Sequence, residues 1–273
     1  MAFAWAADGT RLHYRLLGRS GRDPVLMIQG LGTDMSGWTL QRLRFSPHLP
    51  TVAIDNRGAG RSDKPFGRYS LEAMADDAIT VLDDAGIDRV HVMGASMGGA
   101  ISQLIALRHP DRVRSLVLAC TACRNHQWRR ELLNEWASIA NERGMGEMAK
   151  RAAHWVMAPR SIRRFWPAFG WFGPLAMGLP AHAFASQVRA ILDAPEELAD
   201  ALGALAVPTL VVVGNQDILT PRGDSEELAE RIPGAELVVI SGAAHGLMIE
   251  HATTFNRVVL EFLSRVAADQ TAA

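Results

Sequence analysis

Residues 90–99 read VHVMGASMGG, four mostly apolar residues followed by a glycine-rich segment with one hydroxyl group, at Ser96. The segment 94–98 matches G-x-S-x-G, a pattern that arises by chance in about one chain in ten of this glycine content. It follows an apolar run and precedes a helical pattern, so it predicts a strand, a sharp turn and a helix. Small neighbours would let strand and helix approach, with the Ser96 hydroxyl near the first helical amides. This context makes Ser96 a candidate nucleophile.

Short apolar runs bounded by turn residues recur along the chain and predict buried strands. These runs lie at 25–28, 51–54, 90–93, 115–119, 209–213 and 236–240. Helical patterns separate several of them, including 70–85, with Ser70 as a candidate N-cap and Gly86 as a stop, and 98–109. Strands that alternate with helices predict a doubly wound, mostly parallel α/β sheet, to which residues 12–16 add an antiparallel edge strand.

The alternation stops between about residues 121 and 203, where no strand pattern occurs. This segment holds five of the seven tryptophans, namely Trp128, Trp136, Trp155, Trp166 and Trp171. We expect a core of residues 1–120 and 204–273, and a helical cap of residues 121–203 inserted before the penultimate strands. Between Arg124 and Arg164 basic residues outnumber acidic ones by nine to four, which fits a solvated helical surface and leaves attraction of an anionic substrate open.

Composition excludes several classes of protein. A 273-residue chain with 48% hydrophobic residues and a net charge of −1 is globular, without general attraction to nucleic acid or anionic membranes. No apolar run reaches the ~18 residues of a membrane span, and no secretory signal is evident. Cys120 and Cys123 form one isolated C-x-x-C, which favours two reduced, partly buried thiols over a redox or metal site. We expect a soluble, cytoplasmic protein that needs no cofactor or metal.

A nucleophilic serine requires a base, and His245 is the best candidate among nine histidines. It lies in a loop of small residues directly after the run 236–240, at the carboxyl end of a predicted strand, where open α/β sheets form their sites. Other histidines fall within predicted elements, at a helix end or in the cap: His13, His91, His109, His126, His154 and His182.

The candidate acid is Asp217, which follows another predicted strand in a loop. Asp55 also follows a strand, but it lies upstream beside Arg57 and Arg61, where a structural salt bridge is favoured. No carboxylate follows the run 115–119, so that position is excluded.

Acyl transfer also requires backbone N–H groups that bind the developing oxyanion. Met97 N–H, directly after the candidate nucleophile, is the first expected donor. The second is expected after the run 25–28, where Leu31 N–H is the first choice and Gly30 the alternative. A simple glycine turn is the structural alternative for this loop.

The chain resembles the α/β-hydrolase superfamily over nearly its whole length. The order Ser96, Asp217, His245 is the order of that superfamily. Residues 55–63, DNRGAGRSD, resemble its D-x-R-G-x-G-x-S segment, and His245 to Glu250 resemble its histidine loop. The pattern is similar to 3-oxoadipate enol-lactonases and aclacinomycin methylesterase-like enzymes, and it implies a cap where the tryptophans cluster.

Together these residues and the resemblance predict a serine hydrolase that cleaves a small carboxylic ester or lactone with a largely apolar group through an acyl-enzyme. Gln29 departs from the family, which usually has histidine before the glycine at position 30. Serine at position 96 argues against dehalogenases and epoxide hydrolases, which use aspartate there. C–C bond hydrolysis, perhydrolysis or a lyase reaction with the same triad, or a ligand receptor without turnover, are the alternatives. The specific substrate and the oligomeric state stay open.

Overall fold

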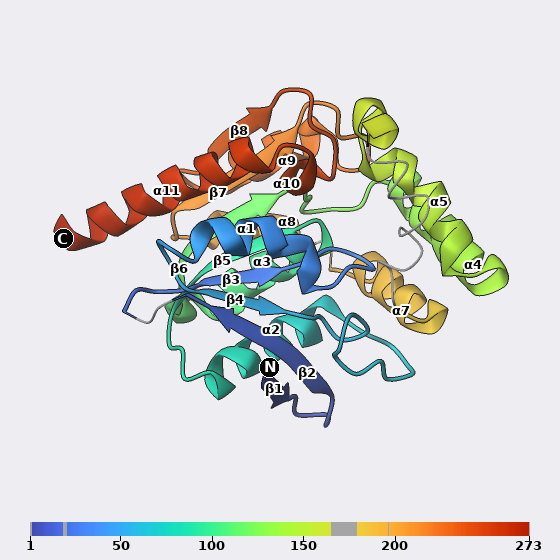
Figure 1. Cartoon of the computed structure of the whole chain (residues 1–273), viewed down its shortest axis with the longest axis horizontal. Helices are drawn as coiled ribbons and strands as arrows, with labels where there is room; N and C mark the ends of the chain where they lie inside the picture. The colour runs from blue at the N-terminus through green and yellow to red at the C-terminus, as the bar shows by residue number, and fades with distance from the viewer. Residues whose placement is uncertain (1, 19–20, 165–178, 196, 273) are drawn as a thin grey trace.

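The computed structural model describes residues 2–18, 21–164, 179–195 and 197–272. Within these residues an eight-stranded sheet has the order β1-β2-β4-β3-β5-β6-β7-β8 (Figure 1). The strands are β1 Ala2–Trp5, β2 Arg11–Leu17, β3 Val25–Ile28, β4 Thr51–Ile54, β5 Val90–Ala95, β6 Val113–Ala119, β7 Thr209–Gly214 and β8 Glu236–Ile240. β2 pairs antiparallel with β1 and β4, and the other pairs are parallel. The predicted mostly parallel sheet is therefore confirmed, with its antiparallel edge.

The sequence did not predict β1. It has four residues and pairs with β2 alone, with Phe3 opposite His13. Its four residues, AFAW, are all apolar, but two are alanines, which are depleted in strands, and Ala4 is the only fully buried one, so the run did not identify a strand.

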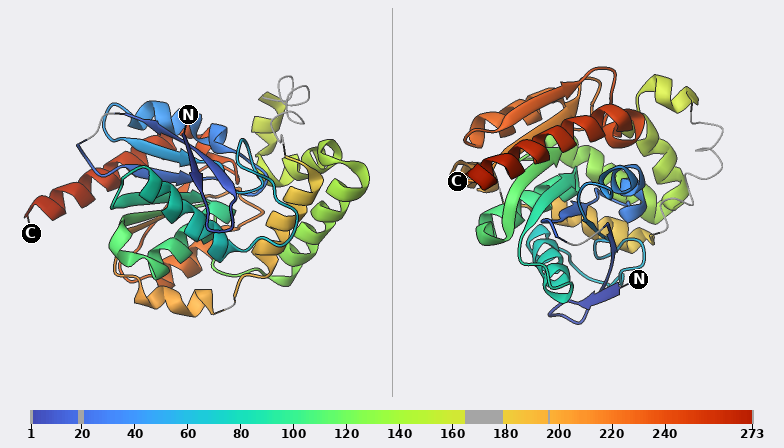
Figure 2. Two further views of the ribbon diagram at one scale, coloured as in Figure 1. Left: turned by 90° about the horizontal axis from the view of Figure 1, so that it is seen from below. Right: turned by 60° about the vertical axis from the view of Figure 1, so that its left-hand side comes forward.

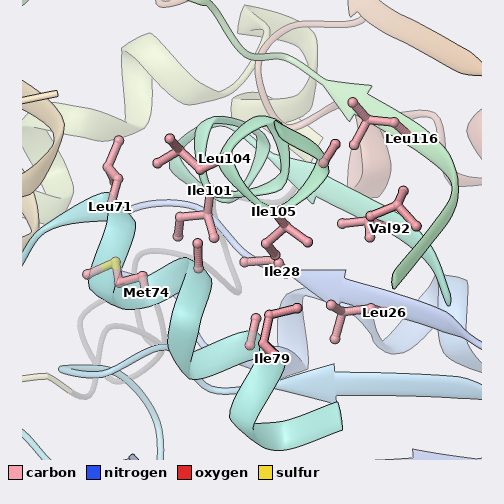
Figure 3. Packing of buried hydrophobic residues seen from close by; sticks show 14 of the residues in the cluster. Leu26, Ile28, Leu71, Met74, Ile79, Val92, Ile101, Leu104, Ile105 and Leu116 are labelled. Carbon is pink, nitrogen blue, oxygen red and sulfur yellow. The ribbon is translucent and has the colours of Figure 1, made fainter. Parts of the chain in front are cut away.

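Helices cover both faces of the sheet. Their bounds are α1 Thr39–Phe45, α2 Leu71–Asp84, α3 Met97–Arg108, α9 Arg222–Arg231, α10 Leu247–Glu250 and α11 Ala252–Ala272. Successive side chains of a strand point to opposite faces. In β3, Leu26 and Ile28 therefore belong to the cluster formed with α2 and α3, as Figure 3 shows, whereas Val25 and Met27 pack with α1 and α11. Ser70 caps α2 as predicted, since its Oγ accepts a hydrogen bond from Ala73 N.

Between β6 and β7 the described residues form helices and no strand. These include α4 Gln127–Arg143, α5 Met145–Val156, α7 Ala181–Leu192 and α8 Leu198–Ala201. We call α4, α5 and α7 the cap helices; they share a cluster with Trp136 and Phe184 and gather at one end of the sheet (Figure 2). Leu198 of α8 instead packs into the cluster of α2 and α3.

The proposed division of the chain at residues 121 and 203 stays a prediction. Trp166 and Trp171, which the sequence assigns to the cap, lie outside the described residues. Of the helices that the structure describes, none is both long and apolar enough to cross a membrane.

Candidate active site

Ser96 lies where β5 ends and α3 begins, in a strained backbone conformation. Its φ of 54° and ψ of −120° are those of the first central residue of a type II′ turn, a position that favours glycine. A Cβ atom on Gly94 would lie 2.1 Å from the Gly98 carbonyl oxygen, and one on Gly98 would lie 2.2 Å from the Ile28 oxygen. Both glycines of the G-x-S-x-G pattern are thus required by backbone contacts, and the predicted strand, turn and helix are confirmed.

Neighbouring residues hold the Ser96 backbone in this conformation. Its N–H donates to the Ala119 carbonyl over 3.0 Å, and its carbonyl accepts a hydrogen bond from Thr121 Oγ1 at 2.8 Å. Strain of this kind persists only when the surroundings impose it. The loop after β6 therefore helps to fix the turn.

His245 and Asp217 form a buried pair on the loops after β8 and β7. His245 Nδ1 lies 2.9 Å from Asp217 Oδ2, which orients the other ring nitrogen, Nε2, away from the carboxylate. Asp217 Oδ1 accepts hydrogen bonds from the amides of Leu219 and Thr220, both at 2.9 Å. Thr220 Oγ1 adds a bond of 2.8 Å to Oδ2 and lies 3.1 Å from His245 Nδ1. The carboxylate is thereby fixed from three directions.

The environment keeps Asp217 ionised. Burial raises the pKa of its carboxyl, but the charge and hydrogen bond of His245, with the bonds from Thr220, outweigh burial and leave this pKa below its usual value. The two loops also bind each other, because Gln216 N donates to the Ala243 carbonyl over 2.8 Å. An ionised carboxylate beside the ring is suited to hold an imidazole in one tautomer and to stabilise its protonated form.

Ser96 and His245 line the same cavity, which lies between the sheet edge and the cap helices. Its volume is about 600 Å³, within the range of pockets for small organic ligands. Most of its lining is apolar and comes from both core and cap, including Leu31, Met97, Leu133, Trp136, Met148, Phe184, Leu219 and Met248. The chemistry that this cavity can host is therefore attack by a hydroxyl on a small, mainly apolar molecule.

The loop after β3 passes directly beside Ser96. A Cβ atom on Gly30 would lie 3.1 Å from the Ser96 Cβ. The Gly30 amide donates to Gln29 Oε1 over 3.1 Å, and the Gly32 amide donates to Gln187 Oε1 over 3.0 Å. In the part of the chain that the structure describes, the Leu31 amide between them has no acceptor. This geometry favours Leu31 over Gly30 as an oxyanion donor.

Met97 occupies the other expected donor position. It is the first residue of α3, and the amides of a first helical turn have no acceptor within their own helix. Met97 lines the same cavity as Leu31 and Ser96.

Asp55, the alternative acid, is used elsewhere. Its Oδ2 lies 2.7 Å from His13 Nδ1 and accepts the Arg61 amide, and its Oδ1 accepts the Met35 amide. Asp55 thus has the structural role expected of it, but its ion-pair partner is His13, and Arg57 does not pair with it. That guanidinium instead contacts other carboxylates, those of Asp77 at 2.6 Å and of Asp8 at 2.8 Å.

The two cysteines and His91 are buried side chains. Cys120 and Cys123 are buried and free, and burial raises the pKa of both thiols. His91 bonds Ser115 within the sheet, and burial lowers its pKa to about 4. Among the described residues, no group of three or more metal-ligating side chains could hold a metal ion.

Most basic side chains at the cavity are paired. Arg124 contacts Glu227 at 2.9 Å, and Lys150 contacts Glu147 at 2.6 Å. Arg129, the only buried one of these three, contacts Asp224 and donates from Nε to the Leu219 carbonyl over 2.8 Å. These contacts pair three of the nine basic residues between Arg124 and Arg164.

Two residues near the site had no signal in the sequence. Thr220 is an ordinary residue three positions after Asp217, and Gln187 is one glutamine inside a cap helix. The contact of Gln187 with the loop after β3 is visible only in the three-dimensional structure, because 155 residues separate it from Gly32.

Known proteins resemble this chain over most of its length. One family model, described as the alpha/beta hydrolase fold, matches residues 23–148, and a second, described as serine aminopeptidase S33, matches residues 180–252. The chain is 29% identical over 268 residues to 3-oxoadipate enol-lactonase 2 of Acinetobacter baylyi, and this alignment covers 95% of each protein. It is 30% identical over 274 residues to the putative carbamate hydrolase RutD of Variovorax paradoxus, which covers 94% of this chain and 97% of that protein.

A solved structure agrees with these relatives. The crystal structure of the enol-lactonase from Burkholderia xenovorans matches with a TM-score of 0.90 and 30% identity, over 96% of this chain and 100% of the other. The similarity therefore includes the sheet and the region of the cap, and does not rest on a single motif.

Proposed function

The chain belongs to the α/β-hydrolase family and is an enzyme of that family, and on this premise we propose that it cleaves a carboxylic ester or lactone through a serine acyl-enzyme. One observation carries the proposal: Ser96 shares a cavity with His245, whose Nδ1 is bonded to the buried carboxylate of Asp217. An ester- or lactone-cleaving reaction in general is supported by the enol-lactonases among the similar proteins.

In the first step Ser96 Oγ attacks the substrate carbonyl carbon, and His245 Nε2 takes the hydroxyl proton. Negative charge moves to the carbonyl oxygen, which accepts hydrogen bonds from the Met97 and Leu31 amides at the N-terminus of α3. Loss of one such donor typically costs about 3 kcal/mol of transition-state stabilisation.

In the second step the tetrahedral intermediate collapses, and protonated His245 gives its proton to the departing alkoxide. Water then attacks the acyl carbon with His245 as base, which releases the acid and restores Ser96. Throughout, the ionised Asp217 carboxylate holds His245 Nδ1–H and stabilises the imidazolium.

The cavity favours a largely apolar substrate group. The Leu133, Trp136 and Phe184 side chains supply apolar surface from the cap, and Met248 supplies it from the core. Each buried CH₂ of a substrate contributes about 0.8 kcal/mol, or up to about fourfold in kcat/KM. We therefore expect kcat/KM for p-nitrophenyl esters to rise from the acetate to medium chain lengths.

A fluorophosphonate probe tests the proposal. The wild type should be labelled and inactivated, and peptide mapping should find the label on Ser96. Ser96→Ala should lose both labelling and ester hydrolysis, because no other hydroxyl occupies the turn. Ser115→Ala is the control, since that serine is fully buried in β6 and bonded to His91, away from the turn at Ser96.

Equal labelling of the wild type and Ser96→Ala would refute the nucleophile. A kcat/KM that stays constant between about pH 5 and 8 would argue against His245 as the base. Labelling without turnover of any ester or lactone in a panel of varied chain length would favour a receptor or a different reaction.

A further inference from the structure

Gln187 of cap helix α7 reaches two loops of the core. Its side chain is fully buried, and both ends of its amide are used. Oε1 accepts a hydrogen bond of 3.0 Å from the Gly32 amide, and Nε2 donates to the Arg57 carbonyl over 2.9 Å. Buried amides that bond backbone on both sides fix the relative position of the segments they join.

One of these contacts lies next to the expected oxyanion donor. Gly32 directly follows Leu31, and its φ of 72° is a conformation that glycine adopts without steric cost and can leave as easily. The Gly32 N–H shares a rigid peptide plane with the Leu31 carbonyl, so an acceptor on this N–H fixes that plane and leaves only the φ and ψ of Leu31 between it and the Leu31 N–H. On the other side, the Gly30 amide is held by Gln29 Oε1.

The second contact gives Gln187 a rigid support. Arg57 is buried and bonds Asp77 through two nitrogens, at 2.6 and 2.7 Å, so its backbone belongs to a fixed part of the core. Asn56 in the same segment donates to the Gln29 carbonyl over 2.9 Å, which ties the start of the loop after β3. Gln187 ties the end of that loop.

We infer that Gln187 is a positioning residue, through which the cap orients the Leu31 amide toward the oxyanion. This inference rests on the proposed acyl-enzyme mechanism. Gln187 does not line the cavity itself, and its amide bonds the Gly32 amide and the Arg57 carbonyl, so its hydrogen bonds act on the reaction through the loop after β3. Loss of its amide should therefore weaken transition-state binding and leave substrate binding nearly unchanged.

The test is Gln187→Met, which keeps the length of the side chain and removes both hydrogen bonds. We expect kcat to fall about 10- to 100-fold, the range for a displaced oxyanion donor, with KM within about threefold of the wild type. The inhibition constant of an alkyl boronic acid, whose adduct on Ser96 is tetrahedral, should rise by the same factor as kcat/KM falls.

Gln41→Met is the matched control. Gln41 is also fully buried, and its Nε2 bonds the Met248 carbonyl and Asn256 Oδ1 between α1 and the C-terminal helices. This variant should lose comparable stability with kcat and boronate inhibition unchanged. A purely structural role for Gln187 predicts the same result for both variants.

Gln187→Glu adds a pH readout. Neutral glutamic acid retains an acceptor for Gly32 N–H and a donor for the Arg57 carbonyl, whereas the carboxylate loses the donor. The ratio of kcat for Gln187→Glu to that of the wild type should therefore rise as pH falls from about 8 to about 5. If Gln187→Met does not fold, a flat ratio overturns the inference.

The outcomes separate the two proposals. If the fluorophosphonate does not label Ser96, the proposed function is wrong. If Ser96 is labelled and Gln187→Met keeps wild-type kcat and boronate inhibition, only the role of Gln187 is wrong.

Discussion

The turn at Ser96 predicts an unusual order of stabilities for two inactive variants. Ser96→Gly should be more stable than Ser96→Ala, although glycine normally destabilises a folded chain. The reason is the φ of 54° at this position, which a residue with a Cβ atom adopts only at a cost. The comparison avoids activity altogether, because both variants lack the hydroxyl.

The magnitude follows from two opposing terms. Relief of the backbone strain should contribute about 1–3 kcal/mol in favour of glycine. The greater freedom of glycine in the unfolded chain costs about 0.4–1 kcal/mol. Ser96 lines an open cavity, so removal of its Cβ creates no new enclosed void. The net expectation is about 1 kcal/mol in favour of Ser96→Gly, or about 2 °C in Tm for a chain of this size.

Urea unfolding at 25 °C and calorimetry measure the difference. Ala100→Gly is the control, because Ala100 lies in the next turn of α3, where glycine should cost about 1 kcal/mol relative to alanine. A Ser96→Gly variant that is equal to or less stable than Ser96→Ala would refute strain at the turn. Destabilisation of Ala100→Gly in the same experiment would show that the measurement detects a change of about 1 kcal/mol.

Two further predictions concern titratable groups. Asp217→Asn should lower kcat/KM about 10³- to 10⁴-fold. The variant should also lose less stability than the wild type when the pH is lowered. The reason is that the pKa of Asp217 is lower in the folded protein than its unfolded value of about 3.9, so its ionised carboxylate stabilises the fold above that pH and loses this contribution as the pH falls through the folded-state pKa. Urea midpoints at pH 7 and about pH 3 would contradict this if the wild type and Asp217→Asn lost equal stability. Burial raises the pKa of Cys120 well above its usual value and that of Cys123 to about 11, so a disulfide reagent at neutral pH should react with the native thiols about 100-fold more slowly than with the unfolded chain. Equal rates in the two states would refute that prediction.

The sequence predicts the central strands well because each is buried on both faces. A continuous apolar run such as Val25 to Ile28 needs no partner to be recognised, and its observed bounds match the prediction. The strand β1 is also apolar, AFAW, but it contains two alanines and is mostly not buried, and its position depends on pairing with β2. The partner of Arg57 was also missed, since Asp77 lies on α2, far from the loop in sequence.

The same distinction divides the candidate site. Ser96, Asp217 and His245 are visible in the sequence because the proposed chemistry lies in their side chains and each follows a predictable strand. The Leu31 amide carries no side-chain signal, and what orients it is a glutamine in another part of the chain. Sequence reasoning could choose the loop but left Leu31 and Gly30 as alternatives, which only the hydrogen bonds of the neighbouring amides distinguish.

Each cap helix contacts one loop of the site, and the three contacts differ in what they control. In α4, Arg129 bonds the Leu219 carbonyl near Asp217, and in α5 the Val156 carbonyl accepts the Gly246 amide beside His245. The functional groups of those two loops are already fixed within the core, because the carboxylate and the imidazole bond each other and Thr220.

The loop after β3 has no such side-chain anchor for its Leu31 amide. Of the three contacts, the hydrogen bond from Gly32 to Gln187 of α7 is therefore the one whose loss would affect oxyanion stabilisation directly. Any displacement of α7 away from the core would break the bond between Gln187 and Gly32, and on the inference above it would thereby loosen the oxyanion donor.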